Sequence, residues 1–252
     1  MVGTIASGMD INCDMGEGSG TDEQLLEAVT SANVACGFHA GDPRTMDATV
    51  ALAVTRGVTV GAHVSYPDRS GFGRRHMEVS EDELTCDVLF QIGALEAFCR
   101  RHGTAVRYVK AHGALYNDIA DDPELAAAYG RAVLAYGGGL AVLALAGTPA
   151  VRVLANLGLR VVSEAFADRA YTPDGRLVSR RRPGAVVTKP ERVTERARRM
   201  ASGRPIEAID GSALTLAPGS VCVHGDTPGS VQLARAIGRA LVDDSVEVTA
   251  FA

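Results

Sequence analysis

The stretch NVACGFHAGDPRTMDATVALAVTRGVTVGA (residues 33–62) contains one complete strand–helix–strand unit. Short apolar and β-branched runs at 33–36 and 58–62 predict two buried strands. Between them, Asp42-Pro43 places a capping side chain directly before a proline at the first helical position. Two strands joined by a helix in this way are expected to lie parallel in one sheet.

The same unit recurs along the chain. We predict strands at 9–13, 33–36, 58–62, 106–110, 140–145, 159–163 and 220–224. Further helix starts are marked by a capping residue before proline or by capping-box spacing, at Asp122-Pro123, Thr227-Pro228, Ser80 with Glu83, and Thr21 with Gln24. Helix ends are marked by Gly57, Gly103, Gly158 and Gly203. The longest predicted helix, 81–102, has an apolar face made of Leu84, Val88, Ile92, Leu95 and Cys99.

This alternation predicts an α/β fold with a parallel sheet covered by helices. A closed barrel and an open doubly wound sheet both satisfy it. Neither GxGxxG nor GxxxxGK[ST] follows the first strand, which removes the usual phosphate-binding reason for an open sheet. Residues 164–219 are less regular and predict an elaborated loop region with a short hairpin. We expect one domain, 9–252, after a short leader, 1–8.

Composition narrows the class of protein. The net charge of −5 and a pI near 5.7 argue against nucleic acid or an anionic membrane as partner. No apolar run approaches the roughly 18 residues that a membrane span needs. The five scattered cysteines lack CxxC pairs and are typical of reduced thiols, so we expect a cytoplasmic enzyme.

Ionisable residues follow nearly every predicted strand. In chain order these are Asp14 and Glu17, His39 and Asp42, His63, Lys110 and His112, Glu164, and His224 and Asp226. The carboxyl ends of the strands of a parallel barrel meet at one mouth, where such folds hold their active sites. We therefore expect these side chains to share one cavity.

Two residue types support that reading. Four of the six histidines lie at strand ends, whereas His76 and His102 are expected to be a loop residue and a helix C-terminal residue. Only Lys110 and Lys189 are lysines among 25 basic residues. A lysine that closes an apolar strand beside carboxylates is a candidate for holding a substrate anion.

Other chemistries have less support. Histidines and carboxylates at several strand ends are compatible with a divalent metal, but there is no HExxH pair, and we assign no metal ligand. No GxSxG elbow indicates a serine nucleophile. Cys13 and Cys36 are expected to be buried core residues. The run Arg180-Arg181-Arg182 is expected to form an exposed loop that could contact a phosphate or a partner chain.

At these strand ends the sequence strongly resembles the LamB/YcsF family, the A subunits of ATP-hydrolysing 5-oxoprolinases. The matching strings are NCDMGEG (12–18), ANVACGFHAGDP (32–43), GAHVSYPDRSGFGRR (61–75), YVKAHGALYN (108–117), SEAFADRAYTPDGRLVSRRRPGAV (163–186) and VHGDTPG (223–229). The resemblance covers nearly the whole chain from Met9 onward.

The resemblance implies an irregular seven-stranded parallel (β/α) barrel of the glycoside hydrolase/deacetylase type. It implies ATP-dependent opening of the lactam of 5-oxo-L-proline to L-glutamate, with ATP and Mg²⁺ as cofactors and separate B and C subunits as partners. Two alternatives remain: a metal-dependent amide or carbohydrate deacetylase on the same barrel, and a non-catalytic scaffold subunit.

Our hypothesis for the site divides the residues by role. Cations for phosphate are expected from Lys110, His63, His112 and His224, and acid–base groups from Asp14, Glu17, Glu164 and Asp226. Substrate is expected to be bound by His39, Asp42, Arg74 and Asn117.

Overall fold

Seven parallel strands close into a barrel in the computed structural model, which describes residues 8–225 and 229–252. The barrel strands are β1 (Gly8–Met15), β2 (Ser31–Ala35), β3 (Thr59–Val64), β4 (Tyr108–Ala111), β5 (Ala141–Leu145), β6 (Arg160–Phe166) and β9 (Ser220–Val223). Closure comes from β9, which pairs in parallel with both β6 and β1. The predicted barrel is therefore confirmed, and all seven predicted strands occur within a few residues of their expected bounds.

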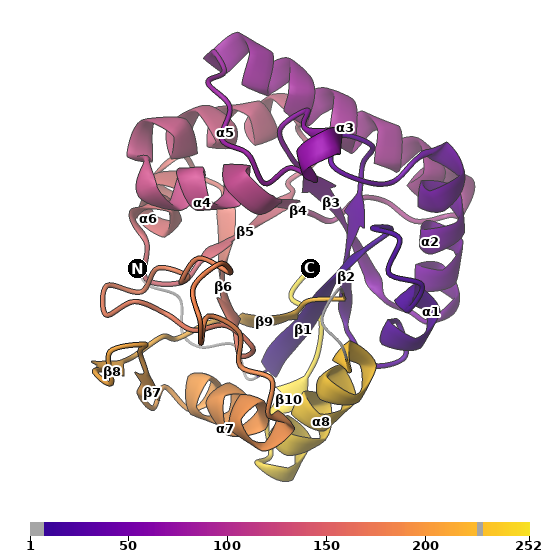
Figure 1. Cartoon of the computed structure of the whole chain (residues 1–252). Helices are drawn as coiled ribbons and strands as arrows, with labels where there is room; N and C mark the ends of the chain where they lie inside the picture. The colour runs from indigo at the N-terminus through magenta and orange to yellow at the C-terminus, as the bar shows by residue number, and fades with distance from the viewer. Residues whose placement is uncertain (1–7, 226–228) are drawn as a thin grey trace.

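Helices surround the barrel on the outside (Figure 1). They are α2 (Pro43–Thr55), α3 (Glu81–Arg101), α5 (Pro123–Tyr136), α6 (Pro149–Asn156), α7 (Pro190–Ala201) and α8 (Ser230–Asp243), with the shorter α1 (Asp22–Leu25), α4 (Gly113–Asp121) and the 3₁₀ turn η1 (Arg69–Gly71). A last strand, β10 (Glu247–Val248), pairs with the first residues of β1. Gly8 therefore belongs to β1 and not to a leader. None of the described helices is long and apolar enough to cross a bilayer.

Most of the predicted helix signals have the expected geometry. Ser80 and Glu83 form a reciprocal capping box, and the carboxylates of Asp42 and Asp122 accept hydrogen bonds from the first free amides of α2 and α5. The five predicted apolar residues of α3 are all buried. Thr21 is the N-cap of α1, so the predicted helix start is confirmed, but its side chain makes no capping bond and α1 is only four residues long. Thr227-Pro228 lies outside the described residues.

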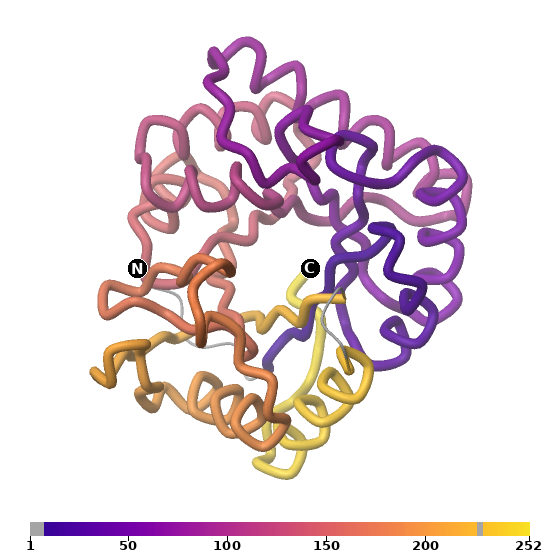
Figure 2. The backbone as a smooth tube through the Cα atoms, viewed as in Figure 1, coloured from indigo at the N-terminus to yellow at the C-terminus, as the bar shows by residue number. Residues whose placement is uncertain are grey.

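The segment between β6 and β9 contains more regular structure than the sequence indicated. The predicted hairpin is present as β7 (Ile206–Glu207) and β8 (Ala213–Leu214). Gly203 follows α7 as a predicted helix end, but no start was predicted for this helix, because its many charges hide a narrow apolar stripe. Buried Arg196 of α7 donates to the carbonyl oxygens of Ala167 and Arg169, at 3.0 and 2.7 Å. These two hydrogen bonds, here called the Arg196 clamp, hold the segment that follows β6 against the barrel. Figure 2 shows this segment in orange.

The barrel interior is polar, unlike the apolar layer between strands and helices. Asp10 lies at its base, 1% exposed, and accepts hydrogen bonds from the hydroxyls of Thr30, Ser31 and Ser220. Burial raises the pKa of Asp10 to about 6 against the opposing effect of these hydroxyl donors. The folded barrel therefore binds a proton at Asp10 more tightly than the unfolded chain does.

We predict that Asp10 makes the folded state less stable as the pH rises. The stability that the folded state gains from binding this proton more tightly is complete below the ordinary pKa of 3.8. It is lost as the pH rises through the folded-state pKa of about 6. In urea unfolding, Asp10→Asn should therefore gain stability relative to the wild type, by roughly 3 kcal/mol between about pH 4 and pH 7. A difference between the two proteins that does not change with pH would contradict this assignment.

Candidate active site

One buried ammonium group lies inside the barrel and contacts side chains from several of its strands. Lys110 projects from β4, is 2% exposed, and places Nζ 2.9 Å from Glu164 Oε1 and 3.0 Å from Asp14 Oδ1. Asn12 Oδ1 and Cys222 Sγ lie 3.3 and 3.2 Å from the same nitrogen. Burial opposes the charge, but the carboxylates outweigh it and raise the pKa of Lys110 well above its ordinary value. Lys110 is thus a fixed cation.

Glu164 lies deeper than the sequence indicated. We expected it just past the end of a strand, but β6 continues to Phe166, so Glu164 is inside the strand and fully buried. Its carboxylate accepts hydrogen bonds from Asn12 Nδ2 at 2.8 Å and from the hydroxyl of Tyr116 at 2.7 Å. It is not among the residues that line the cavity, and we correct its role from acid–base group to partner of Lys110.

Asp14 connects this interior network to the mouth of the barrel. Its Oδ1 lies 3.0 Å from Lys110 Nζ, 3.3 Å from His63 Nε2 and 2.8 Å from Asn33 Nδ2. Burial disfavours the carboxylate, but His63 and Lys110 outweigh burial and hold the pKa of Asp14 well below its ordinary value. Asp14 is therefore a permanent carboxylate that lines the cavity.

Three imidazole rings and a carboxylate occupy one corner of the mouth. Glu17 Oε1 lies 2.9 Å from His39 Nε2, 3.4 Å from His112 Nδ1 and 3.7 Å from His63 Nε2. His39 and His112 stack with 3.7 Å between ring centroids. Burial, followed by the charge of His63, lowers the pKa of both stacked rings. His112 is thus neutral and does not serve as the cation for phosphate that we expected.

A glycine fixes the position of His112 at the start of α4. Gly113 has φ of +58°, and a Cβ at this position would collide with the carbonyl oxygen of Gly73. The close approach lets Ala114 N donate to that carbonyl at 2.8 Å and brings the Phe72 carbonyl within 2.9 Å of His112 Nε2. The loop from β3 therefore holds the histidine of β4 in place.

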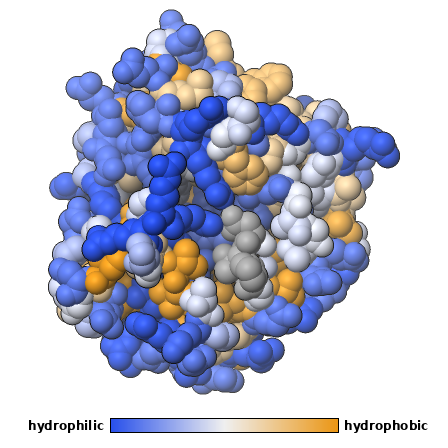
Figure 3. Space-filling view, in the orientation of Figure 1, coloured by the Kyte–Doolittle hydropathy of each residue, from blue (hydrophilic) through white to orange (hydrophobic). Residues whose placement is uncertain are grey.

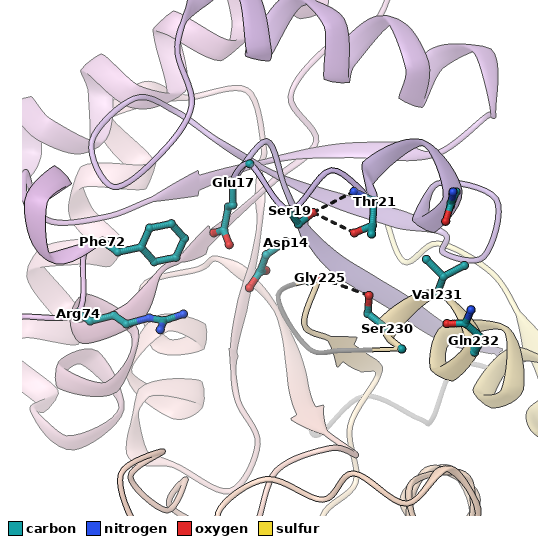
Figure 4. Close-up of a pocket in the computed structure, with 13 residues that line it drawn as sticks. Asp14, Glu17, Ser19, Thr21, Phe72, Arg74, Gly225, Ser230, Val231 and Gln232 are labelled. Atoms are coloured by element: carbon teal, nitrogen blue, oxygen red, sulfur yellow. Dashed lines mark hydrogen bonds between the residues drawn. The ribbon is translucent and has the colours of Figure 1, made fainter.

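The cavity at the mouth has a volume of about 870 Å³. Its lining includes Asp14, Glu17, His63, Lys110, His112 and His224. A second hollow of about 660 Å³ shares Asp14, Glu17 and Arg74 with it. Figure 4 shows the two carboxylates and the guanidinium of Arg74 extending toward the same space. On the face seen in Figure 3, strongly hydrophilic side chains lie above and to the left of the centre, and hydrophobic ones lie below it.

A histidine–aspartate pair forms the opposite wall of the cavity. His224 follows β9, stacks on Phe166 with 5.1 Å between centroids, and places Nδ1 2.9 Å from Asp168 Oδ2. Asp168 is 1% exposed. We did not identify Asp168 from the sequence, because it lies in the irregular segment after β6 and only its place in the string SEAFADRAYTPDG marks it. Such a pair fixes the tautomer of the imidazole.

The remaining predicted residues have different positions. Arg74 and Asn117 line the cavity, and His39 lies behind it, 1% exposed. Asp42 is the N-cap of α2 and does not line either cavity, so we withdraw it as a substrate-binding residue. Asp226 lies outside the described residues. Arginines contribute more than expected: Arg169, Arg180 and Arg181 all line the cavity, although the last two are exposed as predicted.

We predict that removing the Lys110 ammonium strongly destabilises the fold. Lys110→Met leaves two carboxylates buried without their cation, which typically costs about 3–5 kcal/mol. Adding Glu164→Gln should recover part of this loss, because one buried charge is removed. Guanidinium unfolding of both variants measures it, with Lys189→Met at the exposed second lysine as control. A loss for Lys110→Met as small as that of the control would contradict the prediction.

Comparison with known proteins agrees with this architecture. The model of the LamB/YcsF family matches residues 9–252. A 5-oxoprolinase A subunit of Pseudomonas syringae pv. tomato is 51% identical over 249 residues, with 97% of each chain covered.

Comparison with solved structures agrees with this match to the LamB/YcsF family. The lactam utilization protein from Thermus thermophilus has 43% identity and a TM-score of 0.90, with 97% of this chain and 100% of that one covered. A family 4 carbohydrate esterase from Streptomyces lividans has a TM-score of 0.50 at 10% identity, with 99% of this chain and 95% of that one covered, and it shares the fold alone. The match over almost the whole length shows that the chain belongs to the LamB/YcsF family.

Proposed function

We propose that this chain is the A subunit of a 5-oxoprolinase and that it opens the lactam of 5-oxo-L-proline to give L-glutamate. One observation carries the proposal: a histidine that is paired with a buried aspartate, two carboxylates and several arginines line a single cavity at the barrel mouth. The name of the Pseudomonas relative and that of the Thermus structure support the same reaction class.

The proposed reaction needs activation of the amide. An unstrained five-membered lactam resists hydrolysis, and transfer of a phosphoryl group from ATP to its oxygen creates a better electrophile and a better leaving group. We propose that the chain acts with separate B and C subunits, and that this assembly consumes ATP with Mg²⁺. We place the assembly in the cytoplasm, in keeping with five cysteines that form no disulfide.

His224 is our candidate for proton transfer. Because Asp168 accepts from Nδ1, the neutral ring keeps its lone pair on Nε2, the nitrogen left for the cavity. Nε2 can then take a proton from the attacking water and return it to the ring nitrogen as the C–N bond breaks. The γ-glutamyl phosphate that results is hydrolysed by a second water to L-glutamate and inorganic phosphate. Asp14 is less suited to this task, since a carboxylate whose pKa is held well below its ordinary value is a weak base.

Arginines are our candidates for holding the carboxylate of the substrate. Arg169 follows Asp168 directly, is 7% exposed and lines the cavity. One terminal nitrogen donates to the Val178 carbonyl at 2.7 Å, while its Nε has no hydrogen-bond partner among the residues that the structure describes. A buried guanidinium with an N–H group left over is suited to a carboxylate. Arg74 extends toward the same space from the other side.

We predict that His224→Gln abolishes most of the turnover. Glutamine keeps a polar side chain but removes the proton acceptor, so kcat for glutamate formation should fall about 10²- to 10⁴-fold. The assay combines the purified chain with candidate B and C subunits, 5-oxoproline, ATP and Mg²⁺. His102→Gln is the matched control, because His102 ends α3 and pairs with Asp47, away from the cavity. Unchanged turnover in His224→Gln would remove it from the mechanism.

A further inference from the structure

Three atoms with lone pairs lie close together at the corner of the barrel mouth that Glu17, His63 and His112 occupy. His63 Nε2 and His112 Nδ1 lie 3.0 Å apart. Glu17 Oε1 lies 3.7 Å from the first nitrogen and 3.4 Å from the second. The residues come from the carboxyl ends of three different strands, β1, β3 and β4, so the convergence is a product of the closed barrel.

Backbone carbonyls fix which ring nitrogens carry hydrogen. His63 Nδ1 lies 3.3 Å from the Lys110 carbonyl oxygen, and His112 Nε2 lies 2.9 Å from the Phe72 carbonyl oxygen. A carbonyl oxygen only accepts hydrogen bonds, so these two nitrogens are the donors. When neither atom carries hydrogen, the lone pairs of His63 Nε2 and His112 Nδ1 point at each other and at the Glu17 carboxylate, so the contact needs either a proton on His63 Nε2 or a metal ion in the place of that proton. Acceptors alone do not stabilise one another, but a cation between them does.

The spacing of the donors agrees with one metal ion. In a tetrahedral zinc site with bonds of about 2.0–2.1 Å, neighbouring ligand atoms lie about 3.3 Å apart. The three separations here, 3.0, 3.4 and 3.7 Å, scatter around that value. The carbonyl contacts on the far ring nitrogens are also the outer contacts that metal-binding histidines usually make.

His39 lies beside this set in a supporting position. Its Nε2 is 2.9 Å from Glu17 Oε1, and its ring lies parallel to that of His112. Parallel stacked rings cannot both direct an in-plane lone pair at one ion, so His39 donates to Glu17 instead. It is therefore a positioning residue for the carboxylate.

The carboxylates of this region have different neighbours. Lys110 contacts the carboxylates of Asp14 and Glu164, whereas Glu17 Oε1 lies within 3.7 Å of three imidazole rings. A second group, Asp14, Cys222 and His224, is different, because the ammonium of Lys110 already contacts its sulfur and its carboxylate.

We propose that Glu17, His63 and His112 bind one divalent transition metal ion of the zinc type, with its open position toward the cavity. Two imidazoles and one carboxylate are a ligand set that zinc sites use when a water or substrate oxygen completes the coordination. Glu17, His63 and His112 all line the cavity, so an oxygen ligand can reach the ion. The proposal concerns binding by this chain and does not depend on the reaction proposed above.

The test measures metal binding by the purified, untagged chain without substrate. The protein is stripped with chelator, titrated with Zn²⁺ by calorimetry, and analysed for bound metal by mass spectrometry. We expect about one ion per chain and a higher melting temperature in the wild type. His63→Ala and Glu17→Gln should bind more weakly by over roughly 100-fold, since even outer-contact substitutions cost about 10–100-fold.

Controls separate a ligand from a structural residue. His76→Ala, at an exposed histidine paired with Asp118, should bind zinc as the wild type does. His39→Leu should lose about 10–100-fold in affinity, and His39→Gln, which keeps an N–H donor for Glu17, should recover part of it. Circular dichroism checks folding. If His63→Ala does not fold, Glu17→Gln decides, because Glu17 is only partly buried. The proposal would be overturned if the wild-type protein bound no zinc, or if Glu17→Gln bound zinc with unchanged affinity. Either result would show that a proton alone links these groups.

Discussion

The ion pairs of Lys110 inside the barrel are the constraint on which the rest of the site depends. A charged ammonium in a barrel interior is stable only when carboxylates and other acceptors surround it. Asp14 of β1 and Glu164 of β6 supply these carboxylates. In the order of strands, β1 and β6 lie on either side of β4, which carries Lys110. The pairing fixes the register of three strands, and it keeps Asp14 ionised at the floor of the cavity.

Above this floor, the barrel mouth divides into two walls with different chemistry. Glu17 and the rings of His63 and His112 form one wall, where we propose that a metal ion binds. The pair of His224 and Asp168 forms the other, suited to moving a proton. Arginines close the rim, where we propose that the substrate carboxylate binds. The closed barrel is what makes this division possible, because each wall takes its residues from different strands.

The sequence predicted the parts of this arrangement that are encoded locally. Capping residues, glycine stops and strand ends predicted the alternation of strands and helices and located Asp14, Glu17, His63, Lys110, His112 and His224, whereas the closed barrel was implied by the resemblance to the LamB/YcsF family. Features that depend on how deeply a residue is buried, or on packing between distant segments, were not predicted from the sequence. β6 continues three residues beyond its predicted end at 163, which places Glu164 in the barrel interior, and the Arg196 clamp holds the segment in which Asp168 faces His224. No local pattern separates the capping aspartate Asp42 from one that binds substrate.

The most direct measurement of the central claim is a crystal structure of the chain with 5-oxoproline at saturating concentration. Our account places the lactam in the cavity of about 870 Å³, between the His224 and Glu17 walls, with its carboxylate on Arg169. Electron density for the ligand at that position, in that orientation, is the predicted result. Ordered ligand bound elsewhere on the molecule, with the barrel mouth holding only water, would contradict the account.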